Sequence, residues 1–321
     1  MRKRLFPFLL AISFLFTSPL LVFAETLYLY DSKVIPENGM TAIAHRGYSA
    51  IAPENTLPAF RLAGAYGFWG AECDISQTAD GIWILMHDST VDRMTDGTGR
   101  VQDLNYAEIS ALTVDAGNNI EQYPDLKVPM LTEYLDVCKQ YSMHPVIEIK
   151  QTVQPEQLPS LAELLGAREE TDRMIFISFG RELISEMKAL MPEVPAFLIA
   201  SPATLDDVAF CREKGLEGLD FSSPTQVDVV CAAQEAGLKT AVWTVDSLPL
   251  AESFYQMNVE YITTNVLVPG KTPAAVPTTE APATGSEAST VNDKPAQKLN
   301  FFQRIIQWFR NLFAKLFGKK S

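Results

Sequence analysis

Short β-rich runs alternate with helical patterns from Thr41 to Val268, and this alternation restricts the fold more than any other feature of the sequence. Strands separated by helices pair in parallel through βαβ crossovers, which predicts an α/β fold. Roughly 230 residues of this pattern is the size of a TIM-type (β/α)8 barrel. An open doubly wound sheet is the alternative, but no G-x-G-x-x-G follows the first run, so nothing favours dinucleotide binding.

The number of β-rich runs exceeds the eight strands of a barrel by one. We therefore expect one run to be a short accessory strand or no strand at all, and Glu217–Phe221 is the weakest candidate. The nine runs are Thr41–His45, Ala71–Ser76, Ile82–His87, Pro145–Lys150, Met174–Phe179, Ala196–Ala200, Glu217–Phe221, Thr240–Val245 and Tyr261–Thr264.

The segments on either side of the barrel region differ from it in composition. Residues 1–24 carry three basic residues, an apolar run and small residues before the end, which predicts a secretory signal peptide. An uncleaved membrane anchor is the alternative, but the apolar run is short against the ~20 residues of a spanning helix. Residues 271–297 are rich in Pro, Thr and Ala and predict a solvated linker. We expect an exported protein, extracellular, on the cell surface or periplasmic, with its folded domain at 41–268.

Residues 298–320 have the pattern of a basic amphipathic helix. Aromatic and aliphatic residues recur at three- and four-residue spacings, and six cations with no acid accompany them. Such a helix is expected to lie in the interface of an anionic membrane, which would make the exported protein membrane-associated. A helix docked on the barrel and a docking site for a partner protein are the alternatives.

The net charge excludes nucleic acid as a partner. The formal charge is −13, and setting aside three positive charges in residues 1–24 and six in residues 295–321 leaves −22 for residues 25–294. A body this acidic repels nucleic acid, and it repels an anionic substrate unless a metal ion or local cations reverse the field at the site. The four cysteines are widely spaced, which favours buried free thiols over a zinc or redox site.

Acidic side chains occur at the carboxyl ends of predicted strands, where barrel active sites lie. Glu72 and Asp74 share one face of their strand because side chains alternate, and Glu148 ends a later strand. Three carboxylates at one mouth repel each other unless a cation lies between them, and all-oxygen ligands suit Ca²⁺ or Mg²⁺. We predict one divalent cation here. Solvated surface acids are the alternative, which the core-like neighbours of these residues weaken.

Two of the three histidines also end predicted strands at this mouth. His45 and His87 can exchange protons near neutral pH, one as a base and the other as an acid, and their two roles are open at this stage. His144 precedes Pro145 at the opposite end of its strand, and we expect it to be structural.

Several motifs resemble those of the glycerophosphodiester phosphodiesterases and follow the same order. The runs "AHRG", "APENTLPAF", "AECDISQTADG", "MHDS" and "VIEIK" are similar to the family's H-R-G, P-E-N-T, E-x-D with T-x-D-G, H-D and E-I-K. Residues 91–141 resemble the insertion that the family carries after the third strand, and "AVWTVD" is similar to its W-T-V-N. The resemblance covers residues 41–268.

This resemblance implies a TIM-type barrel with a divalent cation that hydrolyses glycerophosphodiesters to sn-glycerol 3-phosphate and an alcohol. By resemblance, the residues concerned are Glu72, Asp74 and Glu148 as metal ligands, His45 and His87 as the acid and base, Arg46 and Lys150 as phosphate contacts, Trp243 as an aromatic wall near the glycerol, and Glu54 in an orienting role beside the site.

Three residues depart from the family's pattern. Asp246 stands where Asn is usual after W-T-V, Asn265 stands where the last residue of I-I-T-D is usual, and Cys73 replaces an apolar residue. We expect none of them to touch a ligand or a proton carrier. Related barrel enzymes of the phospholipase C or D type, acting on a lipid phosphodiester, are the alternative function. A non-catalytic surface binding module is another, although no ligand or histidine of the pattern is missing.

Overall fold

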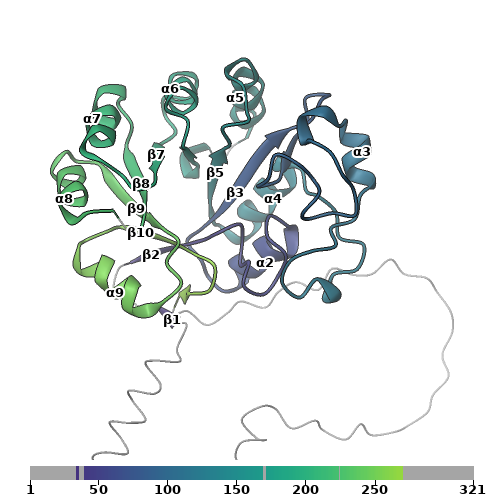
Figure 1. Cartoon of the computed structure of the whole chain (residues 1–321), viewed down its shortest axis with the longest axis horizontal. Coiled ribbons are helices and arrows are strands. Elements are labelled where there is room, and N and C mark those ends of the chain that lie inside the picture. The colour runs from purple at the N-terminus through teal and green to yellow at the C-terminus, as the bar shows by residue number, and fades with distance from the viewer. Residues whose placement is uncertain (1–33, 36–39, 169–170, 224, 270–321) are drawn as a thin grey trace, which may run out of the picture. The chain divides into compact units, whose positions relative to one another are not determined.

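The structure is a computed structural model of the whole chain, and it describes residues 34–35, 40–168, 171–223 and 225–269 (Figure 1). The predicted signal peptide at 1–24, linker at 271–297 and basic helix at 298–320 lie outside these residues. Among the helices that are described, none has the length and apolar character needed to cross a membrane.

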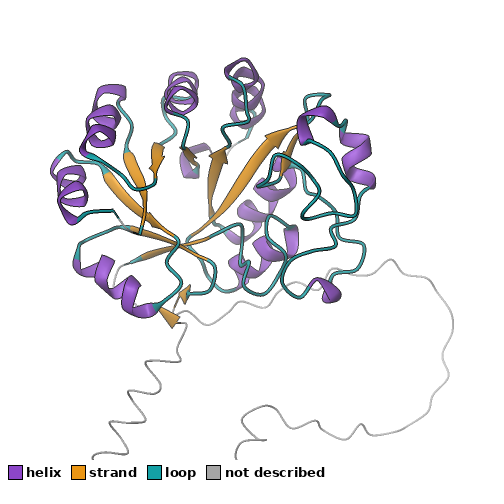
Figure 2. Ribbon diagram, viewed as in Figure 1, coloured by secondary structure: helices purple, strands orange, loops and turns teal. Residues whose placement is uncertain are grey.

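Eight parallel strands close into a barrel inside a ring of helices (Figures 1 and 2). The barrel closes because β2 (Thr41–Ala44) pairs in parallel with both β3 (Gly70–Gln77) and β10 (Tyr261–Thr264). The strands between them are β5 (His144–Ile149), β6 (Ile175–Ser178), β7 (Ala196–Ala200), β8 (Gly218–Ser222) and β9 (Lys239–Trp243). The predicted TIM-type barrel is therefore confirmed. A separate two-stranded pair joins β1 (Val34–Ile35) to β11 (Val268–Pro269).

The helices surround the strands (Figure 2), and their buried apolar residues pack in one cluster with those of the strands. Tyr134 shows how closely the layers interlock: its ring packs edge-on against Phe60 with centroids 4.7 Å apart, and its hydroxyl donates to the carbonyl of Ala71 at 2.7 Å. That hydroxyl also accepts from the amide of Val146 at 3.1 Å, so one side chain joins two helices to two strands. The barrel helices are α2 (Leu57–Ala65), α4 (Leu131–Tyr141), α5 (Leu158–Gly166), α6 (Arg181–Leu190), α7 (Leu205–Lys214), α8 (Val227–Glu235) and α9 (Leu248–Gln256).

A second apolar cluster fills the inside of the barrel. Because side chains alternate along a strand, residues of one strand serve both cores: Ile199 packs inside the barrel, while its neighbour Leu198 faces the helices. The buried members of the inner cluster are Ile43, Val146, Ile175, Ile177, Phe197, Ile199 and Ala241. The polar residues of the mouth thus lie on a packed floor rather than over a pore.

The accessory strand is β4 (Trp83–Leu85), so the expectation that Glu217–Phe221 was the doubtful run is wrong. Glu217–Phe221 corresponds to β8, which pairs with β7 and β9 in the barrel. In contrast, β4 forms an antiparallel hairpin on β3, with Ile75 opposite Leu85. A hairpin needs only a short turn, whereas a parallel crossover needs a dozen or more residues. The strand pattern alone does not reveal which kind of partner a run will find.

Residues between β4 and α4 form a lobe with its own small core, which Figure 1 shows beside β3. The lobe contains α3 (Tyr106–Ala111) and two 3₁₀ turns, η1 (Val101–Asp103) and η2 (Ile120–Gln122). Two further 3₁₀ turns, η3 (Pro155–Gln157) and η4 (Thr171–Arg173), lie in the barrel loops. The predicted insertion at 91–141 covers this lobe together with α4, which packs on α2 as a barrel helix.

Candidate active site

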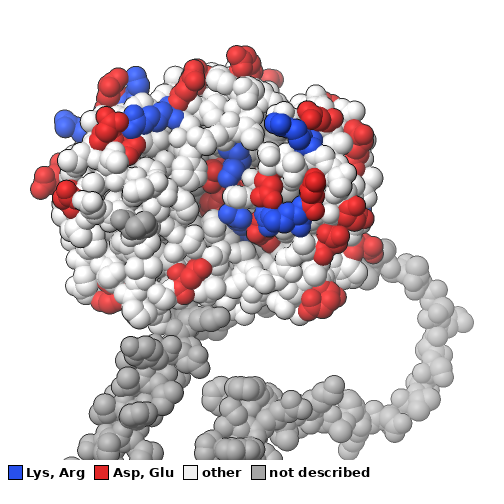
Figure 3. Space-filling model, in the orientation of Figure 1, with Lys and Arg blue, Asp and Glu red and all other residues white. Residues whose placement is uncertain are grey.

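The carboxyl ends of the barrel strands surround an open pocket of about 650 Å³. Figure 3 shows basic and acidic side chains gathered around a hollow in the face in view. Of the nine residues predicted from the sequence, those lining the pocket are His45, Arg46, Glu72, His87, Glu148, Lys150 and Trp243. Asp74 is fully buried behind them, and Glu54 lies beside the pocket, where it contacts Arg46.

Three buried carboxyl groups lie close together at one side of the pocket. Glu72, Asp74 and Glu148 each place an oxygen within 4.8 Å of the others. Burial, followed by repulsion from the other two carboxylates, raises the pKa of Glu72 well above its usual range, and burial and Asp74 raise that of Glu148 to about 7. The Oε1 atom of Glu72 is buried without a hydrogen-bond partner among the described residues. A cation bound to these oxygens would relieve both the repulsion and the unpaired acceptor.

Asp74 differs from its two neighbours because it has cationic partners. Lys150 Nζ lies 3.1 Å from Oδ1 of Asp74 and 2.7 Å from Oε1 of Glu148, and Arg46 Nε lies 3.4 Å from Oδ2 of Asp74. Burial raises the pKa of Asp74, but Lys150, Arg46 and His87 together outweigh it, so its pKa is lowered. Of the three carboxyl groups, Asp74 is therefore the one that keeps its negative charge to the lowest pH.

Asn55 also holds Asp74, and sequence reasoning missed it. Its Nδ2 donates to Oδ2 of Asp74 at 2.7 Å, while its Oδ1 accepts from the amide of Asp74 at 3.1 Å. Asn55 has a left-handed backbone, with φ of 54°, a conformation that Asn tolerates better than most residues. The signal was present in the P-E-N-T run, in which only Glu54 was singled out.

The loop after β2 is shaped by Gly47. Arg46 and Gly47 both have positive φ, at 57° and 79°. A Cβ on Gly47 would lie 2.7 Å from the backbone of Ala59, which is closer than real Cβ contacts come. This turn directs the amide of Arg46 to Oε2 of Glu72, to which it donates at 2.8 Å. The H-R-G run thus places a backbone donor on a metal-ligand candidate.

His45 is held through Asn265. Nδ1 of His45 lies 2.8 Å from Oδ1 of Asn265, which also accepts from the hydroxyl of Ser49. Nδ2 of Asn265 donates to Oδ2 of Asp246 at 2.7 Å, which fixes the orientation of the amide. The expectation that no departure from the family's pattern touches a proton carrier is therefore wrong for Asn265, and Asp246 acts one step behind it. Burial, and then Arg46, lower the pKa of His45.

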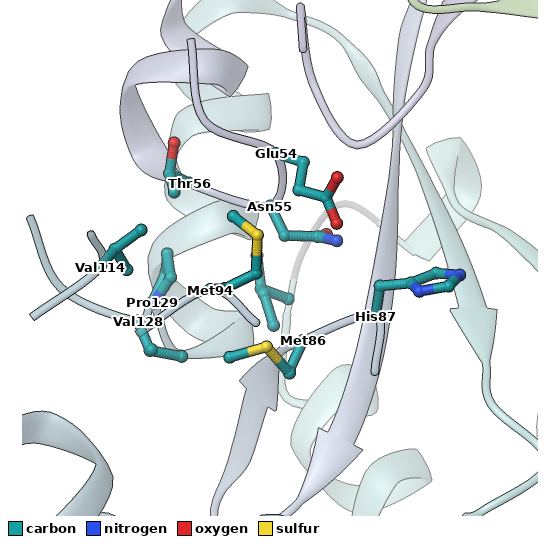
Figure 4. Close-up of a pocket in the computed structure, with 10 residues that line it drawn as sticks. Glu54, Asn55, Thr56, Met86, His87, Met94, Val114, Val128 and Pro129 are labelled. Carbon is teal, nitrogen blue, oxygen red and sulfur yellow. The ribbon is translucent and has the colours of Figure 1, made fainter. Parts of the chain in front are cut away.

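His87 has a charged partner instead. It follows β4, which runs back along β3 and returns the chain to the level of Asp74, where the amide of Met86 donates to the Asp74 carbonyl at 3.0 Å. Nδ1 of His87 lies 2.8 Å from Oδ1 of Asp88. Met86, Met94, Val114 and Val128 belong to a second, smaller pocket beside the active-site pocket. In Figure 4 the ring of His87 points away from Met94.

Arg93 from the lobe connects the His87 side of the pocket to the Arg46 side. Arg93 Nε donates to Oδ2 of Asp88 at 2.6 Å, and its Nη2 donates to Oε1 of Glu54 at 2.6 Å. Glu54 also accepts from Nη1 of Arg46 at 3.0 Å. Burial opposes ionisation of Glu54, but the hydrogen bond from Arg93 and the charge of Arg46 lower its pKa. Glu54 thus holds two arginines at the rim.

The wall opposite the carboxylates is largely apolar and aromatic. Phe179 and Trp243 meet edge to face, with ring centroids 5.6 Å apart. Asp220 lies on this wall, and sequence reasoning missed it. Alternation along Gly218–Ser222 points Asp220 inward, but the run that contains it was the one doubted as a strand.

Two other expectations concern residues outside the pocket. His144 stacks on Trp69 with ring centroids 3.8 Å apart, at the amino end of β5, which fits the structural role expected of it. All four cysteines are free thiols, and three are buried. Cys231 is exposed, so the expectation of buried thiols is wrong for that residue.

Comparison with known proteins gives consistent matches over this region. The Glycerophosphoryl diester phosphodiesterase family matches residues 45–267. Glycerophosphodiester phosphodiesterase 1 of Bos taurus is 31% identical over 268 residues, which cover 72% of this chain and 80% of that protein. Glycerophosphodiester phosphodiesterase of Caldanaerobacter subterraneus subsp. tengcongensis is 31% identical over 229 residues, covering 70% of this chain and 93% of that protein.

Solved structures with the same fold include one with a bound product. The structure of an Oleispira antarctica phosphodiesterase in complex with the product sn-glycerol-3-phosphate superposes with a TM-score of 0.66 at 29% identity, covering 71% of this chain and 93% of that one. A glycerophosphodiester phosphodiesterase from Parabacteroides distasonis superposes with a TM-score of 0.62 at 26% identity, covering 71% and 94%.

Proposed function

The chain belongs to the glycerophosphoryl diester phosphodiesterase family, and from this membership we propose that it hydrolyses glycerophosphodiesters to sn-glycerol 3-phosphate and an alcohol. The observation that carries the proposal is the single pocket in which three carboxylates, two histidines, an arginine and a lysine converge. A phosphodiester is an anion that resists attack by a nucleophile, so its hydrolysis needs positive charge and proton transfer at one place. This pocket has the groups for both.

A divalent cation, Ca²⁺ or Mg²⁺, is part of the proposal. Its ligands would be Glu72, Asp74 and Glu148, whose oxygens lie within 4.8 Å of one another. The unpaired Oε1 of Glu72 and the mutual repulsion of the carboxylates support a cation at this place. When bound, such an ion supplies polarisation of a phosphoryl oxygen and a lowered pKa for a coordinated hydroxyl group.

Arg46 and Lys150 are suited to neutralise the phosphate. Both cations line the pocket and both are tied to Asp74, at 3.4 Å for Arg46 Nε and 3.1 Å for Lys150 Nζ. Glu54 fixes a second nitrogen of Arg46 from behind. A guanidinium held in this way loses little conformational freedom when an anion arrives, which favours a defined phosphate position.

The partners of the two histidines assign them different roles. Because Asn265 presents its carbonyl oxygen to His45, Nδ1 of His45 carries the proton and Nε2 has the free lone pair, as a base requires. The neutral amide of Asn265 provides no negative charge that would stabilise an imidazolium. His87 lies against the Asp88 carboxylate, whose negative charge can stabilise a protonated ring, and a general acid needs such a ring. We therefore assign the base to His45 and the acid to His87.

In the proposed reaction, His45 takes a proton from the attacking hydroxyl group at Nε2. That hydroxyl belongs either to the glycerol itself, which gives a cyclic phosphate, or to water. Arg46 and Lys150 offset the charge that builds on the phosphoryl oxygens, and His87 gives a proton to the leaving alcohol. Attack by water gives sn-glycerol 3-phosphate directly, whereas a cyclic phosphate gives it only after a water molecule opens the ring in a second step.

The direct test is to incubate the purified protein with glycerophosphocholine and glycerophosphoethanolamine, with and without chelator, and to assay sn-glycerol 3-phosphate. Metal-dependent release of this product supports the proposal. Lysophosphatidylcholine serves as the comparison substrate. Hydrolysis of the lipid alone would favour the phospholipase alternative, and binding of substrate without turnover would favour the binding-module alternative.

Export and membrane association are also part of the proposal, and their support comes from the sequence. Residues 1–24 have the features of a secretory signal peptide, and residues 298–320 have those of a basic amphipathic helix. The acidic barrel region and the basic tail carry opposite charges, so attraction to an anionic membrane would act on the tail. We propose that the enzyme acts outside the cytoplasm, at a membrane surface.

A further inference from the structure

The active-site pocket has two chemically different sides. The metal-ligand candidates, both histidines and both cations lie toward β2, β3 and β5. The opposite side, contributed by β6 to β9, is lined by Ile177, Phe179, Ile199, Asp220, Trp243 and Thr244. The phosphate chemistry described above uses the first side, and no role has been assigned to the single acid on the second.

Asp220 is buried with one oxygen unpaired. It is 4% exposed, and its Oδ1 atom has no hydrogen-bond partner among the residues that the structure describes. On the neighbouring strands, Ile199 and Ala241 lie directly opposite it in register. Burying a polar group among such neighbours costs free energy unless a partner is bound, so an unpaired acid at this place is unfavourable for folding alone.

Three more unpaired polar atoms lie on the same pair of strands, and two of them share the face of Asp220, while the third, Thr240 Oγ1, belongs to the opposite face. Ser222 Oγ and Trp243 Nε1 are both buried without a hydrogen-bond partner within the described parts of the chain. Ser222 and Trp243 are opposite each other in register, two residues along the strands from Asp220 and Ala241 and therefore on the same face. This wall therefore concentrates unpaired hydrogen-bonding groups, as expected of a surface that receives a polar ligand.

The surroundings of Asp220 favour a neutral ligand. Burial, with a smaller contribution from Glu148, raises the pKa of Asp220 to about 8. A carboxylic acid that keeps its proton at neutral pH both donates and accepts a hydrogen bond, which matches a hydroxyl group. An ammonium group would need the carboxylate form, which the apolar neighbours disfavour.

We propose that Asp220 recognises a hydroxyl group of the substrate's glycerol, with Trp243 and Phe179 packed against the glycerol carbons. The inference rests on the proposed function and adds a specificity determinant to it. Glycerol is the part that all glycerophosphodiesters share, so a built hydrogen-bonding group suits it better than it suits a variable head group. The hydroxyl concerned is the terminal one, because the 2-hydroxyl is a candidate nucleophile.

The test compares two substrates and two variants. Glycerophosphocholine has the terminal hydroxyl, whereas the matched diester of propane-1,2-diol lacks it and keeps the 2-hydroxyl. The wild type should prefer glycerophosphocholine in kcat/KM by roughly ten- to a hundredfold, the effect of one lost hydrogen bond at a buried site. In Asp220→Ala this preference should disappear. Asp220→Asn keeps a donor and an acceptor and should recover most of it.

The control variant is Glu235→Gln, which removes an acid at the exposed end of α8. It should keep the full wild-type preference. An absence of preference in the wild type would overturn the inference without any variant, even if Asp220→Ala fails to fold. So would a preference that survives in Asp220→Ala. The inference would also be overturned if the loss of kcat/KM in Asp220→Ala depended on whether the leaving alcohol is choline or glycerol.

Failure of the proposed function would be distinguishable from failure of the inference. If the wild type hydrolyses neither diester, the function is wrong, and calorimetric binding then decides the role of Asp220. Wild type should bind sn-glycerol 3-phosphate more tightly than propane-1,2-diol 1-phosphate, and Asp220→Ala should bind the two equally. Equal binding by the wild type would overturn the inference.

Discussion

Nδ1 of His45 lies 2.8 Å from Oδ1 of Asn265, an amide that Asp246 holds from behind at 2.7 Å. Relative to the family's usual W-T-V-N and I-I-T-D runs, the amide and the carboxylate have exchanged places. A neutral amide fixes the tautomer of His45 without stabilising its charged form. Together with burial, which lowers the pKa of His45, this suits the ring to the proposed role of a base.

The first prediction concerns this exchange. Asn265→Asp should place two carboxylates within hydrogen-bond distance and destabilise the protein, while a new charge beside His45 raises its pKa. A base with a raised pKa stays protonated, and therefore inactive, up to a higher pH. The acid limb of the pH profile of kcat/KM should therefore move to higher pH. Adding Asp246→Asn should restore stability and keep the shift. Thermal melts of all four proteins should give a coupling of about 1–3 kcal/mol. Additive effects would show that the two side chains act independently.

The second prediction separates the histidines by leaving group. His87→Ala should lose about 10²–10⁴ in rate on glycerophosphocholine, since an alkoxide leaves poorly without a proton. The same variant should keep most of its rate on glycerol 3-(p-nitrophenyl) phosphate, because p-nitrophenolate needs no acid. His45→Ala should be slow on both substrates. If the rate of His45→Ala, and not that of His87→Ala, is restored on glycerol 3-(p-nitrophenyl) phosphate, the assigned roles are reversed.

The third prediction is that cation binding tightens as the pH rises. Glu72 has a raised pKa and Glu148 one of about 7, so a cation must displace protons from them at low pH. The increase in melting temperature on adding Ca²⁺ or Mg²⁺ should therefore be larger at pH 8 than at pH 6. At a hundredfold excess over Kd the stabilisation is about 2.7 kcal/mol. Glu72→Gln should abolish most of the increase, and an unchanged increase would place the cation elsewhere.

The fourth prediction follows from the raised pKa of Asp220, about 8 in the folded state. Between the unfolded value and 8, the folded state holds a proton that the unfolded state has lost, so stability falls as the pH rises. Asp220→Asn has no such proton, and its advantage in melting temperature over the wild type should grow from pH 5 to pH 8. Both proteins are compared in chelator, and a constant difference would contradict the shifted pKa.

The fifth prediction concerns the basic tail. The full-length protein should co-sediment with anionic vesicles at low salt and be released by high salt, because the attraction of its cations is screened. Deleting residues 298–321 should remove this binding and leave the hydrolysis of soluble glycerophosphodiesters unchanged. Vesicle binding by the truncated protein would exclude the tail as the anchor.

The sequence alone determined the barrel and much of its mouth. All nine runs predicted as strands form strands, with ends within two residues of those observed, because alternation of apolar residues is a local property. The same local rule put Glu72 and Asp74 on one face of β3 and opposed them to Cys73. The H-R-G run was visible as a motif, whereas the turn that brings Gly47 close to Ala59 was not predicted.

Only the tertiary structure decided which distant residues meet. Asn265 reaches His45 across 220 positions of the chain because β10 closes the barrel against β2, and no local pattern encodes that closure. Likewise, β4 turns back on β3 rather than joining the barrel, which brings His87 to the mouth from an antiparallel strand. Asp220 became visible as an unpaired acid once β8 proved to be a barrel strand. Periodicity determines which face of a strand a residue occupies, whereas the closed sheet determines what that face meets.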